Sequence, residues 1–474
     1  MRLDGNIEGC EAGGVSGWAC DADAPAAVLR LEVRVGPVRI GGCVADQARA
    51  DLIAAGKGNC GFHFVPDAPL SLAERDRLNV RALGGDHVLI DGFGGPQPDP
   101  YGGPEVAAGA RRFRRAVVHI GTEKTGSTSL QRFLAVNRER LMAAGLFVPL
   151  SLAPASVAPA AELLNHSDLV TACLAEWRDG DELRVARRVA GVAEVAAFRA
   201  DLAARFAAEV ARAPGRCDTL FISSEHYHSR LLLLHEVAKV RRFLAPYAER
   251  IEVWVYLRPQ HELAASQYGM HLLGGADDAE MLPMLPYPEG YRRTRITGRE
   301  YFDYAHLLAR WAAIFGRTQV HPRLFQAGSL RNGDVVDDVL HRLGIAGDGL
   351  MRVAREAGNV SPRGQRFMVR FLRGMGARAP ADVAWAAGWV AERLRASEPG
   401  DGVVPARGAV AAFMEQFAAS NERVRAEWFP ARAALFDVDL ARFPERAEAE
   451  ELSGEAVTDI LIGLLRVERR MSGV

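Results

Sequence analysis

The residues with the clearest chemical potential form a glycine-rich run, Gly121 to Ser129, which follows the apolar segment 116–120. Gly121 and Gly126 lack a β-carbon, so the backbone between them can approach a bound group closely. Successive N–H groups of such a turn, with the N-terminus of a following helix, form a site for an anion. The side chains add hydroxyl donors and one ammonium group, from Thr125, Ser127, Thr128, Ser129 and Lys124. We therefore expect this run to bind a phosphate or a similar anion.

The position of the lysine separates two classes of phosphate-binding loop. The loop of nucleoside triphosphatases has the pattern G-x-x-x-x-G-K-[ST], in which the lysine follows the second glycine. Here Lys124 precedes Gly126, and Ser127 occupies the place of that lysine. The chain has 55 arginines but only three lysines, and arginine does not replace a compact ammonium group where one is needed. The order of residues therefore favours an anion other than a magnesium-bound triphosphate.

This run resembles the phosphosulfate-binding loop of the sulfotransferase family. Its segment Lys124–Thr128 matches the family's core, Lys-[Ser/Thr]-Gly-[Ser/Thr]-[Ser/Thr], throughout. The resemblance covers residues 112–370. It implies that the chain binds 3′-phosphoadenylyl sulfate, transfers its sulfuryl group to an acceptor hydroxyl and needs no metal. It also implies that Gly121 and the residues from Lys124 to Ser129 bind the donor, with Lys124 neutralising the leaving phosphate oxygens.

A second feature of the family lies about 130 residues further along the chain. Arg258 follows the apolar segment 251–257, and Ser266 comes eight residues later. In sulfotransferases, an arginine at a strand end and a serine eight residues later bind the 3′-phosphate of the donor. A guanidinium group offers a planar fork to a phosphate, and Pro259 suits the start of a helix that would carry the serine. The resemblance therefore implies that Arg258 and Ser266 form a second phosphate contact.

The general base is expected where a third apolar segment, 220–223, ends. In the family, the strand before the one that carries the arginine delivers the base to the acceptor hydroxyl. This chain offers Glu225, His226 and His228 at that place. A base must come within hydrogen-bond distance of the attacking oxygen. We expect Glu225 to take this role, with His226 as the first alternative and His228 as the second; otherwise His228 is expected at the surface.

Alternating strand and helix patterns predict how these residues are held. The segments that predict buried strands are 116–120, 219–223, 251–257 and 320–325. The segments with helical spacing are 130–144, 191–213 and 301–315. Such alternation is typical of a parallel sheet with covering helices. We expect a P-loop-like, three-layer α/β domain over 112–374, followed by a helical region over 375–474 that packs on it.

The first 95 residues have a different pattern, which predicts a small all-β sandwich. Segments 29–35, 60–65 and 78–83 alternate apolar and polar residues, as half-buried strands do. A glycine- and proline-rich stretch over 96–111 predicts a linker.

Three pieces of the N-terminal region, 17–19, 45–52 and 60–62, loosely resemble a small β module attached to some bacterial glycan-modifying enzymes. This resemblance implies an accessory or acceptor-binding role, with plain structural packing as the alternative. With the family as a whole, it implies a carbohydrate or lipid-linked glycan acceptor in a bacterium that makes a surface polysaccharide.

Bulk properties exclude few function classes. The net charge of −1 gives no reason to expect a nucleic acid, and the first 100 residues carry −5 and the rest about +4, which places an anion site in the second part. No apolar run has membrane-spanning length and the N-terminus lacks the apolar core of a secretory signal, so we expect a cytoplasmic protein. The sequence contains no Cys-x-x-Cys pair, the spacing that would predict a metal site. The alternatives are a P-loop kinase of a small molecule and a catalytically degenerate glycan-binding protein.

Overall fold

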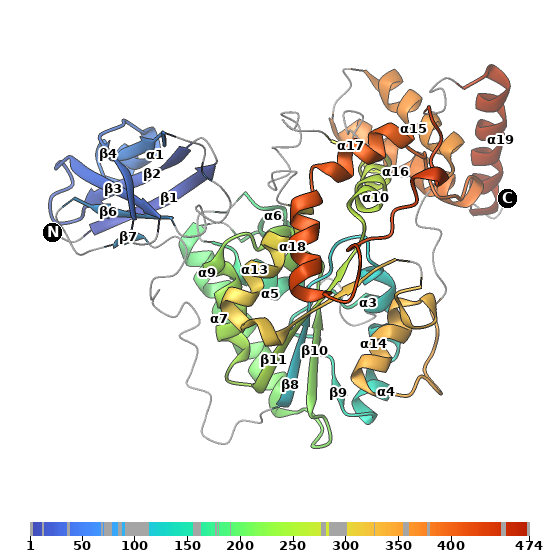
Figure 1. Cartoon of the computed structure of the whole chain (residues 1–474), viewed down its shortest axis with the longest axis horizontal. Helices are drawn as coiled ribbons and strands as arrows, with labels where there is room; N and C mark the ends of the chain where they lie inside the picture. The colour runs from blue at the N-terminus through green and yellow to red at the C-terminus, as the bar shows by residue number, and fades with distance from the viewer. Residues whose placement is uncertain are drawn as a thin grey trace.

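The structure is a computed structural model of the chain (Figure 1). It describes residues 3–11, 14–35, 38–67, 70, 78–83, 88–90, 113–154, 163–175, 178, 180–189, 191–275, 281–283, 301–326, 328–353, 360–376, 380–446 and 452–471. The linker expected over 96–111 lies outside the described residues.

A five-stranded parallel sheet forms the centre of the larger part of the chain. Its strands are β8 (Phe113–His119), β9 (Leu146–Phe147), β10 (Thr219–Ser223), β11 (Ala248–Leu257) and β12 (Val320–Leu324). Their order is β12-β11-β8-β10-β9, and every neighbouring pair is parallel. The α/β fold class expected from the sequence is confirmed, and four of the five strands were expected. The short edge strand β9 was not, because two residues carry no recognisable pattern.

The strand order explains why one edge of the sheet holds the site. β8 lies in the middle, with β10 on one side and β11 on the other. The chain leaves β8 toward one edge, returns through β10 and then crosses to β11. In open parallel sheets, ligands bind beyond the carboxyl ends of the strands where the connections diverge in this way. The ends of β8, β10 and β11 carry the glycine-rich run, Glu225 and Arg258 respectively, so the fold brings them to the same edge.

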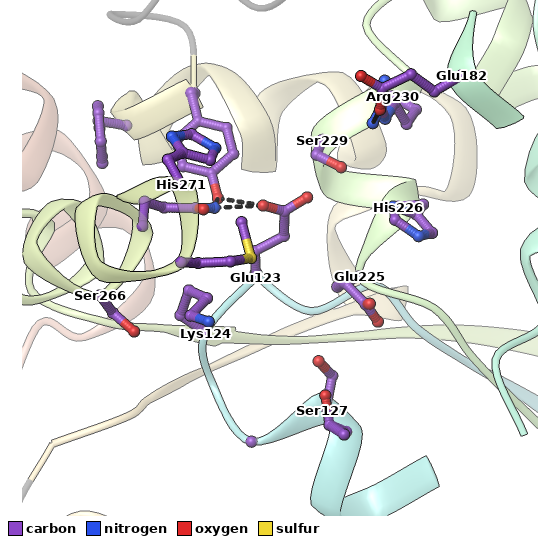
Figure 2. Close-up of a pocket in the computed structure, with 16 residues that line it drawn as sticks. Glu123, Lys124, Ser127, Glu182, Glu225, His226, Ser229, Arg230, Ser266 and His271 are labelled. Carbon is purple, nitrogen blue, oxygen red and sulfur yellow. Dashed lines mark hydrogen bonds and ion pairs between the residues drawn. The ribbon is translucent and has the colours of Figure 1, made fainter. Parts of the chain in front are cut away.

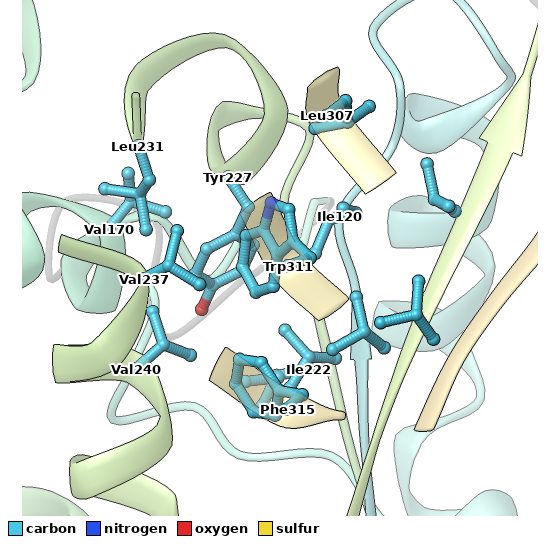
Figure 3. Packing of buried hydrophobic residues seen from close by; sticks show 14 of the residues in the cluster. Ile120, Val170, Ile222, Tyr227, Leu231, Val237, Val240, Leu307, Trp311 and Phe315 are labelled. Carbon is cyan, nitrogen blue, oxygen red and sulfur yellow. The ribbon is translucent and has the colours of Figure 1, made fainter. Parts of the chain in front are cut away.

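Helices cover both faces of this sheet (Figure 1). One face is covered mainly by α5 (Ser167–Cys173), α7 (Gly191–Ala211), α9 (Leu234–Leu244) and α13 (Tyr304–Phe315), and the other by α3 (Ser127–Val136), α4 (Arg138–Ala143) and α14 (Val335–Leu343). Alternate residues of β8 enter the two cores: Val118 lies in the first and Val117 in the second. Figure 3 shows the first core, where the rings of Tyr227 and Trp311 meet edge to face with centroids 6.1 Å apart.

The helix expected over 130–144 is interrupted at Asn137, which separates α3 from α4. The Asn137 side chain donates to the carbonyl of Met351 at 2.9 Å and accepts from its N–H at 2.7 Å. Asparagine competes well for backbone groups with its own amide, which lowers its preference for helix interiors. A contact with a residue more than 200 positions away thus ends the helix where local periodicity would continue it.

The N-terminal strands form two antiparallel sheets. One has the order β1-β2-β5, from β1 (Leu3–Glu11), β2 (Gly14–Asp21) and β5 (Gly61–Phe64), and the other the order β4-β3-β6-β7, from β3 (Leu29–Val35), β4 (Val38–Ala45), β6 (Leu78–Ala82) and β7 (Val88–Ile90). A short helix, α1 (Ala50–Ala54), lies between β4 and β5 in the chain. Residues of both sheets, including Val15, Phe62, Leu31 and Val33, share one buried cluster. The expected sandwich is therefore confirmed.

The other described elements of the chain are helices. Its remaining helices are α6 (Glu182–Arg187), α8 (His226–Arg230), α10 (Gln260–Leu273), α15 (Pro362–Met375), α16 (Pro380–Ser397), α17 (Arg407–Glu415), α18 (Ala418–Trp428), α19 (Gly454–Met471) and the short 3₁₀ helices Arg317–Gln319, Arg331–Gly333 and Leu440–Arg442. The C-terminal helices pack on the α/β part: the Phe413 ring of α17 lies 5.4 Å from Phe302, and Asn421 of α18 accepts from the Gln260 amide at 2.7 Å. Among the described residues, no helix combines the length and the apolar character that crossing a membrane requires.

Candidate active site

The glycine-rich run forms a tight loop between β8 and α3, and hydrogen bonds to β11 hold its first residues. The Thr122 N–H donates to the carbonyl of Tyr256 at 2.9 Å, and its hydroxyl donates to the same oxygen at 3.1 Å. The Thr125 hydroxyl is buried and donates to the Thr122 carbonyl at 2.6 Å. A hydroxyl has one hydrogen to donate, and that of Thr125 is already donated within the loop. It is therefore the backbone N–H of this residue, and not its hydroxyl, that is available to an anion.

Two glycines of the loop are required by both conformation and space. Gly121 and Gly126 have φ angles of 92° and 79°, in the left-handed region that other residues rarely adopt. A β-carbon on Gly121 would lie 3.1 Å from the α-carbon of Glu225, and one on Gly126 would lie 2.8 Å from a methyl group of Val335. Lys124, between them, also has a positive φ, of 58°. The loop is thus pressed against the residue expected to be the base.

The loop leads into the N-terminus of α3, where no side chain caps the helix. The first N–H groups of a helix have no intrahelical acceptor, and together they attract an anion. Here they belong to Ser127, Thr128 and Ser129. Three of the residues that are expected to bind the nucleotide donor therefore lie in the first turn of a helix without a side-chain cap.

Lys124 and Ser127 border a cavity of about 630 Å³ (Figure 2). The residues that line it are Glu123, Lys124, Gly126, Ser127, Thr128, Glu182, Glu225, His226, Ser229, Arg230, Ser266, Gln267, Met270, His271, Tyr301 and Phe302. Burial lowers the pKa of the Lys124 ammonium and Arg258 adds to this effect, whereas Glu123 and Glu225 oppose it. A lysine so placed has been partly stripped of water, so it gains from an anionic ligand.

Arg258 contacts the loop, and Ser266 lines the cavity beside it; Arg258 is not among the residues that line this cavity. Arg258 follows β11, and its Nη1 donates to the carbonyl of Lys124 at 2.8 Å while its Nε donates to Glu262 at 3.1 Å. Ser266, on α10, lines the same cavity as Lys124. The structure thus joins two sequence features that lie more than 130 residues apart into one site.

Glu225 follows β10, and two amide groups hold its carboxylate. The Gln131 amide donates to Oε2 at 2.8 Å and the Asn165 amide donates to Oε1 at 3.2 Å. His226 lines the cavity next to Glu225, as Figure 2 shows. The two alternatives for the base therefore both lie at the site, with Glu225 the more firmly oriented of them.

His228 is not at the surface, which corrects one of the two expectations for this residue. Its side chain is buried, and Nε2 lies 3.0 Å from the carbonyl oxygen of Tyr301. Burial lowers its pKa to about 4, although the charge of Glu123 opposes this shift. The turn of α8 directs this ring into the protein core, while His226 faces the cavity.

Several residues of the site were missed by the sequence analysis. Gln131 is a buried polar residue on the core-facing side of α3, and a polar residue at such a position is the one signal that could have indicated it. Asn165 lies in a segment without a recognisable pattern, whereas Gln267 and Tyr301 lie in expected helices in which nothing about their spacing indicates a role. Glu123 was part of the motif, but it received no role. Its carboxylate accepts from the hydroxyl of Tyr301 at 2.7 Å and from the amide of Gln267.

Similarity to known proteins is limited. No protein-family model matches the chain, and no curated protein matches it. A solved structure that it resembles is the crystal structure of a sulfotransferase from Alicyclobacillus acidocaldarius, with 18% sequence identity, a TM-score of 0.32, and coverage of 57% of this chain and 98% of that one. At this identity and TM-score, the similarity alone assigns neither a substrate nor a catalytic residue.

The sequence predicts no metal site. Within the described part of the chain, no three side chains of histidine, cysteine, aspartate or glutamate gather closely enough to bind an ion. The oxygens of Glu225 already accept from two amides.

Proposed function

We propose that the protein is a sulfotransferase that moves the sulfuryl group of 3′-phosphoadenylyl sulfate to a hydroxyl of a carbohydrate or lipid-linked glycan. The observation that carries the proposal is the hydrogen bond from Arg258 to the Lys124 carbonyl, with Ser266 on the cavity that Lys124 lines. The donor has two separate anionic groups, on its 5′ and 3′ sides. The loop and the Arg258–Ser266 pair offer two adjacent sets of anion ligands to receive them.

Each part of the loop has a role in sulfuryl transfer, which we treat as an in-line displacement similar to phosphoryl transfer. The N–H groups of residues 125–129 and the hydroxyls of Ser127, Thr128 and Ser129 hold the 5′-phosphosulfate. Lys124 stabilises the negative charge that develops on the bridging oxygen as the sulfur–oxygen bond breaks. Catalysis of this kind consists of positioning and electrostatic stabilisation.

Glu225 is the proposed general base. It takes the proton of the acceptor hydroxyl as the oxygen attacks sulfur, so the negative charge passes to the departing 3′,5′-adenosine bisphosphate. The two amide donors, Gln131 and Asn165, support this role because they fix the carboxylate beside the loop. His226 is the alternative base. The carbohydrate acceptor rests on the loose resemblance of the N-terminal sandwich to a module of glycan-modifying enzymes.

A thermal-shift experiment tests the donor. A ligand at 100 times its dissociation constant stabilises the protein by about 2.7 kcal/mol, which is a readily measured shift. We expect this response with 3′,5′-adenosine bisphosphate and a smaller one with ATP and magnesium. A response to ATP–magnesium alone would identify a P-loop kinase, and no response to either nucleotide would identify a degenerate glycan-binding protein.

A matched pair of arginine variants shows where the bisphosphate binds. Arg258→Met removes the guanidinium group that contacts the loop, and we expect it to lose most of the response. Arg423→Met removes an exposed guanidinium group of α18, whose side chain is 57% exposed, and we expect the response to persist. Equal responses in both variants would place the nucleotide elsewhere.

A further inference from the structure

Glu123 is a carboxylate at a place where the proposed donor brings several negative charges. It precedes Lys124 in the loop and lines the same cavity. Its Oε2 accepts both the Tyr301 hydroxyl, at 2.7 Å, and the Gln267 amide, as the dashed lines in Figure 2 show. Burial would raise its pKa, but the nearby Ser229 hydroxyl, the hydrogen bond from Tyr301 and the nearby rings of His228 and His226 lower it overall. The group is therefore ionised at neutral pH.

An ionised carboxylate at this place has an energetic cost. A buried charge is destabilising unless it is paired and hydrogen-bonded, and the neighbouring Lys124 ammonium attracts the charge of Glu123. Its charge also opposes the binding of an anion in the same cavity. The neutral hydrogen bonds from Gln267 and Tyr301 compensate for part of the cost.

The bonds of Glu123 connect the loop to α10. Gln267 directly follows Ser266 on that helix, and its bond to Glu123 fixes the helix face that is turned toward the loop. Neighbouring residues of an α-helix point about 100° apart, so fixing the direction of Gln267 also fixes that of Ser266. The carbonyl of the next loop residue, Lys124, accepts a hydrogen bond from Arg258. Consecutive loop residues are thus bonded to the two segments expected to hold the 3′-phosphate.

We propose that Glu123 is a positioning residue that sets the distance and rotation between the loop and Ser266, so that both anionic groups of the donor are bound together. This inference rests on the proposed function, because it assigns the 3′-phosphate to Arg258 and Ser266. Tyr301 completes the arrangement, because its hydroxyl bonds both Glu123 and Gln267.

The test compares two nucleotides that differ by one phosphate. Calorimetry gives the dissociation constants of 3′,5′-adenosine bisphosphate and of adenosine 5′-monophosphate, and the constant of the monophosphate divided by that of the bisphosphate measures how much the 3′-phosphate strengthens binding. We expect Glu123→Ala to reduce this ratio about tenfold, which is the size of one charge-assisted hydrogen bond. Gln267→Ala should reduce it by a similar factor. The double variant should lose no more than either single one, because both changes break the same link.

Glu123→Gln separates positioning from charge. Both donors bond a single oxygen of Glu123, so the amide oxygen of a glutamine can accept both and should restore the ratio. If the negative charge alone mattered, Glu123→Gln and Glu123→Ala would both raise the ratio, because they remove a repulsion. That result would overturn the proposal, and so would additive effects in the double variant.

The remaining outcomes are also decisive. Equal weakening of both nucleotides in Glu123→Ala would indicate general damage to the site and would overturn the proposal. If that variant does not fold, as judged by its melting curve, Gln267→Ala and Glu123→Gln still decide the question. If the unchanged protein binds neither nucleotide, the proposed function fails first, and the two failures are thereby distinguished.

Discussion

The two ends of the site are built in different ways. The proposed donor end comprises Gly121–Ser129, Arg258 and Ser266, and most of its ligands are backbone N–H groups of one continuous run of chain. The proposed acceptor end comprises Glu225, its supports Gln131 and Asn165, and His226, all of them side chains from separate segments. A backbone site is specified by local residue order, whereas a side-chain site exists only after the fold has formed. The two ends should therefore respond differently to substitution.

The largest expected effect is at the acceptor end. Glu225→Gln should lower kcat by about 10²- to 10⁴-fold, the usual range for a general base, and should leave the affinity for 3′,5′-adenosine bisphosphate within a few-fold. Turnover is measured with the best acceptor from a panel of oligosaccharides. His226→Ala is the matched variant and should cost less than about tenfold. If the losses in the two variants are reversed, His226 is the base and Glu225 its neighbour.

Lys124→Ala should have the next largest effect. In the proposed mechanism the ammonium group stabilises charge that develops on the leaving oxygen, and removal of one such group costs roughly 3 kcal/mol, or about 100-fold in kcat. Unlike Glu225→Gln, this change should also weaken nucleotide binding, because Lys124 contacts the donor before and during the reaction. Lys57→Ala, in the N-terminal sandwich, is the control. Unchanged turnover in Lys124→Ala would remove this residue from the mechanism.

The donor end of the site could be predicted from the sequence more completely than the acceptor end. The order of residues from Gly121 to Ser129 indicated both an anion loop and the strand and helix on either side of it, because those features are local. Arg258 and Ser266 were found because their spacing matched a pattern. Gln131 and Asn165 were not found, because they support Glu225 from positions that lie 94 and 60 residues away from it in the chain. The break at Asn137 escaped for the same reason, since its partner is Met351.

Three buried histidines make the acceptor end the more sensitive to acid. The His119 ring lies 2.8 Å from the hydroxyl of Ser223, the last residue of β10, and His166 accepts from the N–H of Ser223 at 2.9 Å. His228 lies in α8, the helix that begins directly after Glu225. Burial lowers the pKa of His119 to about 3, aided by Arg342; burial also lowers that of His166 to about 4, against opposing backbone hydrogen bonds. All three rings are therefore neutral in the folded protein at neutral pH.

The sign of the resulting pH dependence follows from proton binding. Between pH 6.5 and about 4, the unfolded chain protonates these rings and the folded chain does not, so stability falls as the pH falls through this window. With a folded pKa of about 4, as for His166, each ring contributes roughly 2 kcal/mol of loss at pH 5. Urea unfolding at pH 7.5 and pH 5 measures the difference. His119→Phe should reduce it, whereas His63→Gln, at an exposed position of β5, should leave it unchanged.

The smallest expected effect tests the support of the base directly. Gln131→Leu removes the amide that donates to Glu225 at 2.8 Å and keeps a side chain of similar size within the core. A hydrogen bond to a charged group is worth about 1.5 kcal/mol, so kcat should fall roughly tenfold. Because Gln131 orients only the acceptor end, nucleotide affinity should not change. A loss of nucleotide affinity equal to the loss in kcat would mean that the two ends are one mechanical unit, and that the division into a backbone-built and a side-chain-built half does not describe how the site works.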